Sequence, residues 1–135
     1  MGGGVTSSQA VTAKRGNADN WFRFQNLDVW KRAADLSPVL FSYGETLDRQ
    51  KLYRFAEQLR SATLSITNNI AEGSGGLSAV DFRNFLNMAR RSVFEVANML
   101  ILFERESILS GSDIEKTLRE LEEQSRMLLG LMRTL

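Results

Sequence analysis

The chain has 135 residues, of which 17 are basic and 16 acidic, so that its formal net charge is +1, and 43% of its residues are hydrophobic. This length and apolar content suit one domain with its own core and exclude a wholly disordered chain. Dedicated nucleic-acid binders are usually more basic, so a nucleic acid would have to contact a local patch.

The residue types that are missing narrow the chemistry further. The sequence contains no Cys and no His. This removes disulfides, thiolate ligands, the usual general base near neutral pH and the commonest metal ligand. We therefore expect no metal or cofactor. No apolar run approaches the ~20 residues of a membrane span, and the first residues lack the apolar core of a signal peptide. The sequence predicts a cytoplasmic protein without a membrane partner.

The first segment, residues 1–20, is small and polar without periodicity, which predicts a flexible tail before a helical domain at residues 21–135. Lys14 and Arg15 could touch an anionic partner, but a solvated tail is the favoured interpretation.

A first helix is expected at residues 27–43, and Pro38 within it predicts a kink or break because proline restricts Ser37. The stretch YGETLD, residues 43–48, is then expected to form the turn. The residues expected to face the core are Leu27, Trp30, Ala33, Ala34, Leu40 and Phe41.

The second helix is expected at residues 49–72 and the third at residues 79–106, where Ser78 and Asp81 have the spacing of a capping box. Both contain apolar residues at helical spacing. Those of the second are Leu52, Phe55, Ala56, Leu59, Ala62, Ile66 and Ile70. Those of the third are Phe82, Phe85, Leu86, Ala89, Val93, Val96, Ala97 and Leu100.

A fourth helix is expected after residue 112, where Ser112 and Glu115 have the spacing of another capping box. A heptad seam follows, made of Ile114, Leu118, Leu121, Ser125, Leu128, Met132 and Leu135. Amphipathic helices joined by short connections predict an all-α, antiparallel up-down-up-down four-helix bundle.

The second helix has polar and small residues outside its core stripe. Ser61, Ser65, Asn69 and Glu72 share one side of the helix, and Tyr53, Arg60, Leu64, Thr67 and Ala71 share another. A helix with two packing faces in so small a bundle predicts contact with another subunit. For Asn69 and Glu72 the alternative is a structural role at the end of the helix, where backbone groups need partners.

The third helix carries Arg83, Arg90 and Arg91 on one broad face. We expect Arg91 to pair with Glu95 four residues on, and Arg90 to pack its stem against Phe94. Together with Arg60, these arginines are the candidate contact for RNA or a partner. That hypothesis gains weight if subunits repeat the patch around a ring, because the local fields add.

The stretch EGSGGLS, residues 72–78, resembles a phosphate-binding loop but lacks the Lys-Ser/Thr that follows the glycines, and it follows a helix. We expect instead that Gly73, Gly75 and Gly76 supply unusual backbone angles at a helix end. Glu72 and Glu95 could form a catalytic carboxylate pair, but contacts with arginines such as Arg60 or Arg91 are favoured. No enzyme is expected.

Several motifs together resemble the 23S rRNA intervening-sequence proteins, a bacterial four-helix-bundle family. The resemblance covers residues 22–135. It rests on Leu27-Asp28-Val29-Trp30, Gln58-Leu59-Arg60, Asn69-Ile70-Ala71-Glu72-Gly73, the segment Ser78 to Phe85, and Ser92 with Glu95. The candidate interface or polar network consists of the second-helix residues Ser61, Ser65, Asn69 and Glu72 together with Ser92 and Glu95 of the third helix.

The resemblance implies a homopentameric ring of up-down-up-down bundles. It also implies a relation to the accessory variability protein of diversity-generating retroelements, which binds a reverse transcriptase and nucleic acid. Two expectations follow: an oligomeric adaptor that contacts RNA or DNA, or a protein-interaction subunit of a reverse transcriptase or another mobile-element system. The chain departs from the family pattern at Thr67, where proline is common, at Arg90-Arg91, and at Pro38. Because Thr67 stands in place of that proline, we expect an unkinked second helix.

Overall fold

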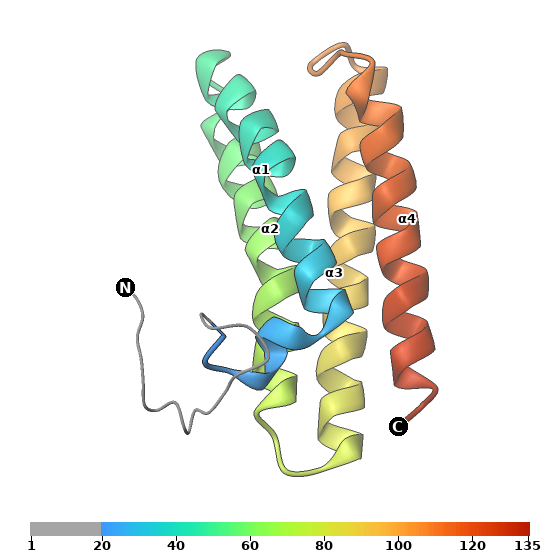
Figure 1. The fold of residues 1–135 in the computed structure, drawn as a ribbon. Helices are drawn as coiled ribbons and strands as arrows, with labels where there is room; N and C mark the ends of the chain where they lie inside the picture. Colours follow the sequence, from blue (N-terminus) through green and yellow to red (C-terminus); the bar gives the residue numbers. More distant parts are fainter. Residues whose placement is uncertain (1–19) are drawn as a thin grey trace.

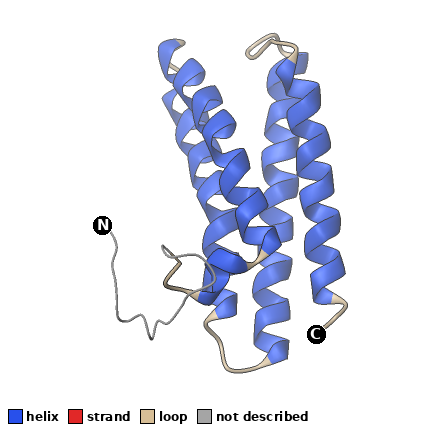
Figure 2. Cartoon of the chain, in the orientation of Figure 1, coloured by secondary structure: helices blue, strands red, loops and turns tan. Residues whose placement is uncertain are grey.

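The computed structural model describes residues 20–135, and within this range it contains helices and no strand (Figure 2). A short 3-10 helix, η2 (Arg23–Asn26), precedes the long helices α1 (Asp28–Arg49), α2 (Tyr53–Ser74), α3 (Ala79–Arg105) and α4 (Asp113–Met132). The interpretation of Lys14 and Arg15 lies outside the described residues, as does almost all of the expected tail.

The long helices lie side by side as a bundle (Figure 1). Helices that follow one another in sequence pack together, most extensively α2 with α3, and the seam between α1 and α4 is the least extensive. This confirms the predicted all-α four-helix bundle. None of the helices in residues 20–135 has the length and apolar character needed to span a bilayer.

The core is formed by one apolar stripe from each long helix, as the spacing predicts. Leu59, Leu86, Leu100 and Leu121 are fully buried. The expectation for Phe55 is wrong: this side chain is 41% exposed, because it lies in the first turn of α2 and only stacks on Phe103, with ring centroids 5.1 Å apart.

Helix α1 differs most from the expectation. It runs unbroken through Pro38 to Arg49, so the predicted break does not occur and YGETLD is helical. Within this stretch Tyr43 and Leu47 are buried, and the tertiary packing of these side chains outweighs the local cost of proline. Ser37 also donates its hydroxyl to the Ala33 carbonyl at 3.0 Å.

Helix α4 buries the predicted heptad seam, fully at Leu121 and Leu128 and in part at Leu118. It also buries Gln124 completely, which periodicity did not predict. The Gln124 amide donates to the Val29 carbonyl of α1 at 2.8 Å, while its Oε1 has no partner among the described residues. A polar side chain thus ties α4 to α1 across the least extensive seam.

The α2–α3 corner depends on close approach rather than on unusual backbone angles. Gly73 lies within α2, and neither Gly75 nor Gly76 has a positive φ, so that expectation is wrong. A Cβ at Gly73 would lie 2.6 Å from the Phe85 Cβ and 2.9 Å from Phe82. Glycine is needed here because α3 crosses directly over it.

The two predicted capping boxes have different outcomes. The Ser78 hydroxyl accepts the Asp81 backbone N–H at 3.0 Å and so caps α3. Ser112 has helical dihedrals, and its side chain makes no capping hydrogen bond to α4. A capping side chain reaches the free N–H groups from an extended backbone, which Ser78 has and Ser112 lacks. The prediction for Ser112 is therefore wrong.

Candidate functional site

A groove of about 500 Å³ runs between the exposed sides of α2 and α3. Ser61 and Ser65 form part of its wall on α2, and Glu95 closes it from α3. Its complete lining is Arg54, Glu57, Gln58, Ser61, Ala62, Ser65 and Glu95. The small side chains come from consecutive turns of α2, so the two backbones lie close and leave a shallow polar trough.

A hydrogen-bond network joins the two helices along this groove. The Ser92 hydroxyl of α3 lies 2.8 Å from the Ser65 hydroxyl of α2. The Asn69 amide donates to the Ser65 hydroxyl at 2.9 Å and to the Ser65 carbonyl at 2.8 Å. Asn69 therefore acts within its own helix, in keeping with a structural role, and it also orders the residue that meets Ser92.

The carboxylates of the candidate network do not come together. Glu95 Oε2 lies 3.5 Å from the Gln58 amide. Glu72 lies a further 14 residues along α2, which is about 21 Å of helix rise. Glu72 and Glu95 therefore do not form the carboxylate pair considered from the sequence, since such pairs lie within about 10 Å of each other. Neither residue meets an arginine within residues 20–135, so the expected contacts with Arg60 and Arg91 are wrong.

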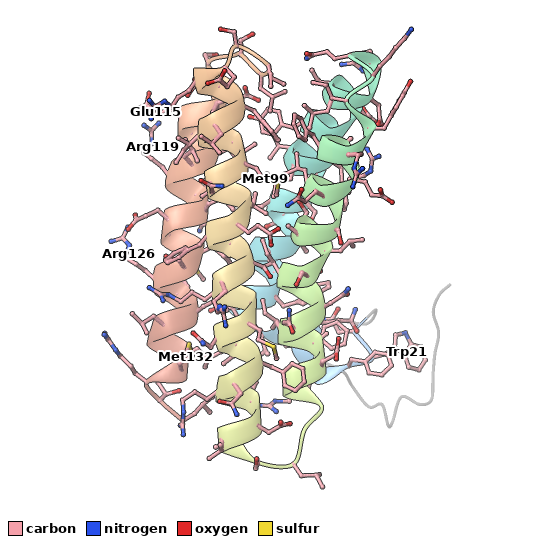
Figure 3. The ribbon with its side chains drawn as sticks, turned by 180° about the vertical axis from the view of Figure 1, so that it is seen from behind. Trp21, Met99, Glu115, Arg119, Arg126 and Met132 are labelled. Carbon is pink, nitrogen blue, oxygen red and sulfur yellow. The ribbon has the colours of Figure 1, made fainter. Side chains whose placement is uncertain are left out.

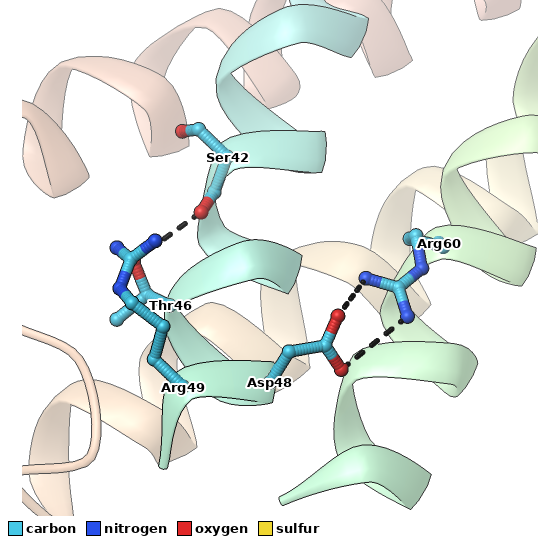
Figure 4. Close-up of polar contacts among 5 residues, drawn as sticks. All are labelled: Ser42, Thr46, Asp48, Arg49 and Arg60. Atoms are coloured by element: carbon cyan, nitrogen blue, oxygen red, sulfur yellow. Dashed lines mark hydrogen bonds and ion pairs between the residues drawn. The ribbon is translucent and has the colours of Figure 1, made fainter. Parts of the chain in front are cut away.

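The four candidate arginines do not form one patch. Arg60 lies at the α1–α2 seam, where its guanidinium binds Asp48 at 2.9 and 3.5 Å (Figure 4). Its side chain lies against Gly44, at which a Cβ would be 3.0 Å from Arg60 Nη1. This pair fastens α1 to α2 and takes Arg60 out of the proposed contact surface.

The arginines of α3 have no carboxylate partner in the described part of the chain. Arg83 donates to the Leu135 carbonyl at 2.9 Å. The Arg90 guanidinium lies over the Phe94 ring, 4.8 Å from its centroid, as the spacing predicts. Arg91 is exposed, and the expected pair with Glu95 does not form. Arg90 and Arg91 are therefore left without an ion-pair partner among residues 20–135.

A further row of arginines, which the sequence analysis did not single out, follows α4 and the residue directly after it. Arg119, Arg126 and Arg133 are seven residues apart, and each is exposed. Figure 3 shows the first two projecting from α4. Arg119 pairs with Glu115 and Arg126 with Glu122, each at 3.1 Å. The seven-residue interval between these arginines is visible in the sequence and could have indicated the row. Glutamates neutralise two of its three positive charges.

The described residues hold no group of three or more Asp or Glu side chains that could bind a metal ion. In the core, burial raises the pKa of Tyr43 above its ordinary value of 10.0, with a smaller opposing effect from its hydrogen bond to Thr117.

Residues 25–130 match the family model described as 23S rRNA-intervening sequence protein. The chain belongs to this family. A search of curated proteins finds no match. The family match contains all of α1, α2 and α3, most of α4, the α2–α3 groove and the α3 arginines. Trp21, Phe22 and Arg133 lie outside it.

Proposed function

We propose that the protein is a non-enzymatic, oligomeric adaptor of the cytoplasm that contacts RNA, or a partner that carries RNA, through the arginines of α3. Within this proposal the four helices run up and down with antiparallel neighbours. Five bundles form a ring, as the family resemblance implies.

The proposal is carried by Arg90 and Arg91 of α3, which have no carboxylate partner among the described residues. Arg60 and Arg119 do have carboxylate partners, and Arg83 donates to the Leu135 carbonyl. Unpaired cations on one helix create a positive local field although the chain has a net charge of only +1. Repetition around a ring would add these fields into a surface that attracts a polyanion.

RNA binding by a labelled oligonucleotide, measured over a series of salt concentrations, tests the contact. Because phosphate contacts release counterions, affinity should fall linearly on a logarithmic plot of salt concentration. Arg91→Ala should lower affinity and reduce the slope by about one. Arg119→Ala is the matched control and should change both less, since Glu115 already neutralises that guanidinium. Absence of binding even at low salt would remove RNA from the proposal.

A second candidate is a protein-interaction subunit, for example of a reverse transcriptase in a mobile element. It is supported by apolar side chains that α3 exposes: Met88 at 41%, Phe94 at 52% and Leu102 at 47%. A neighbouring reverse-transcriptase gene together with co-purification of its product would favour this function. Loss of co-purification in Leu102→Asp, with RNA affinity unchanged, would separate it from the first.

A further inference from the structure

A ladder of aromatic rings leads outward from the start of α1 through η2. The Phe24 ring lies 5.3 Å from Trp30 at an interplanar angle of 58°. Phe22 then stacks on Phe24 with centroids 5.6 Å apart and the planes only 16° from parallel. Phe22 is 64% exposed and Trp21 74%. Figure 3 shows Trp21 standing away from the long helices.

Hydrogen bonds hold this exposed ladder in place. The Gln25 side-chain oxygen accepts the backbone N–H groups of Trp21 and Phe22, at 2.8 and 2.9 Å. Arg23 donates to the Ser74 carbonyl at 3.2 Å and places its guanidinium 5.2 Å from the centroid of the Phe82 ring. The outward position of Phe22 is therefore fixed by its neighbours and is not explained by burial in the core.

The chemistry around the ladder selects the kind of ligand. An outermost ring that is already stacked on its inner side can extend the stack with another flat ring. The same segment contains two carboxamides that bond to each other, with the Asn20 amide donating to the Asn26 side-chain oxygen at 2.6 Å. Carboxamides are side chains that read the edges of bases. Arg23 is followed five residues later by the exposed Asp28, so the choice of ligand rests on the exposed stack and the carboxamides and not on net charge.

We propose that Phe22, stacked on Phe24, is a stacking platform for an unpaired base of single-stranded RNA. This rests on the proposed RNA contact and adds a second element to it. The α3 arginines bind phosphates of any strand, whereas the platform requires a base that is not paired. Trp21 and Phe22 precede the region that matches the family model. We therefore assign the platform to this chain and not to the family as a whole.

Binding of single-stranded oligo(A) and of a duplex RNA of the same length tests the platform. Phe22→Leu keeps an apolar side chain but removes the flat ring, so it should weaken oligo(A) binding about tenfold and leave duplex binding unchanged. Phe55→Leu is the matched control, because Phe55 is also exposed and stacked but begins α2, far from η2. It should change neither affinity.

The possible failures are distinguishable. If Arg91→Ala weakens RNA binding while Phe22→Leu binds oligo(A) as tightly as the unaltered chain, the platform is wrong and the proposed function stands. Equal weakening toward duplex and single strand would also overturn stacking. Binding to phosphatidylcholine vesicles that is lost in Phe22→Leu, without a change in RNA affinity, would assign the ladder to lipid. No RNA binding by the unaltered chain would overturn both proposals.

A second measurement needs no altered Phe22. In a Trp30→Phe chain, Trp21 is the remaining tryptophan, since the sequence has two. Oligo(A) should quench its fluorescence even at high salt, where phosphate contacts are weakened. Equal emission with and without oligo(A), under conditions where binding is seen by another method, would contradict the platform.

Discussion

Two glycines illustrate how single residues are constrained in this bundle. Gly73 faces α3 so closely that a Cβ would lie 2.6 Å from Phe85 Cβ, whereas a Cβ at Gly130 would meet nothing within 4 Å. Both lie within helices, where glycine is less favourable than alanine by roughly 0.5–1 kcal/mol. The same substitution should therefore have opposite effects at the two positions.

We expect Gly73→Ala to lower the free energy of unfolding by about 1–3 kcal/mol, because it forces α2 and α3 apart. Gly130→Ala should raise it by about 0.5–1 kcal/mol. Urea denaturation followed by circular dichroism measures both. A Gly73→Ala chain as stable as the unaltered one would show that the corner can open without cost.

For single residues, the sequence predicted a contact within one helix but not a contact between two helices. The stacking of Arg90 on Phe94 followed from a four-residue spacing within one helix. The partner of Arg60 did not, because Asp48 lies on another helix and 12 residues away. Spacing within a helix determines which side chains are near neighbours, but it carries no information on which residue of another helix they meet.

The ends of the helices are decided by local backbone conformation. Ser78 and Ser112 both precede an acidic residue three positions on, and the sequence makes them equivalent. Only Ser78 is extended, with φ −129° and ψ 152°, and only its hydroxyl accepts a backbone N–H. The Ser112 side chain makes no such bond to α4.

Ser78→Ala should lower the free energy of unfolding by about 1 kcal/mol, since one backbone donor at the start of α3 loses its acceptor. Ser112→Ala, the matched control, should change it by less than about 0.5 kcal/mol. Equilibrium urea denaturation of the two chains checks this. Equal losses would mean that Ser112 caps α4 in solution.

The length of α1 shows where element-level reasoning fails. Proline and a following Tyr-Gly pair are ordinary signals for the end of a helix. Here Tyr43 and Leu47 are buried against the other helices, and the hydrophobic burial of these residues holds the helix together to Arg49. Local propensity is a weak signal whenever the continuing residues can be buried.

At the scale of the whole molecule, we propose the α2–α3 groove as the contact between subunits of the proposed ring. The groove is lined by small side chains at Ser61 and Ser65, which allow another backbone to approach closely. Polar residues line it, so it can remain hydrated in a separate subunit and still form hydrogen bonds at an interface.

If subunits assemble through this groove, light scattering should give a multiple of the 15.2 kDa chain mass. Ser61→Arg should then reduce the mass toward that of one chain, because a long charged side chain fills the groove. Ser42→Arg, on the exposed side of α1, is the matched control and should leave the assembly intact. A single-chain mass for the unaltered protein would rule out the ring. An unchanged mass for Ser61→Arg would place the interface elsewhere.

The sequence by itself determined the helical class, the core stripe of each helix and the seam of α4, because apolar periodicity reports burial within one element directly. It also indicated that Ser65 and Asn69 belong to a polar side of α2. Only the tertiary structure decided that Ser65 meets Ser92, that Glu72 and Glu95 lie apart, and that Arg60 belongs to Asp48. These contacts join different helices, and their geometry depends on the rotation and depth at which the helices pack.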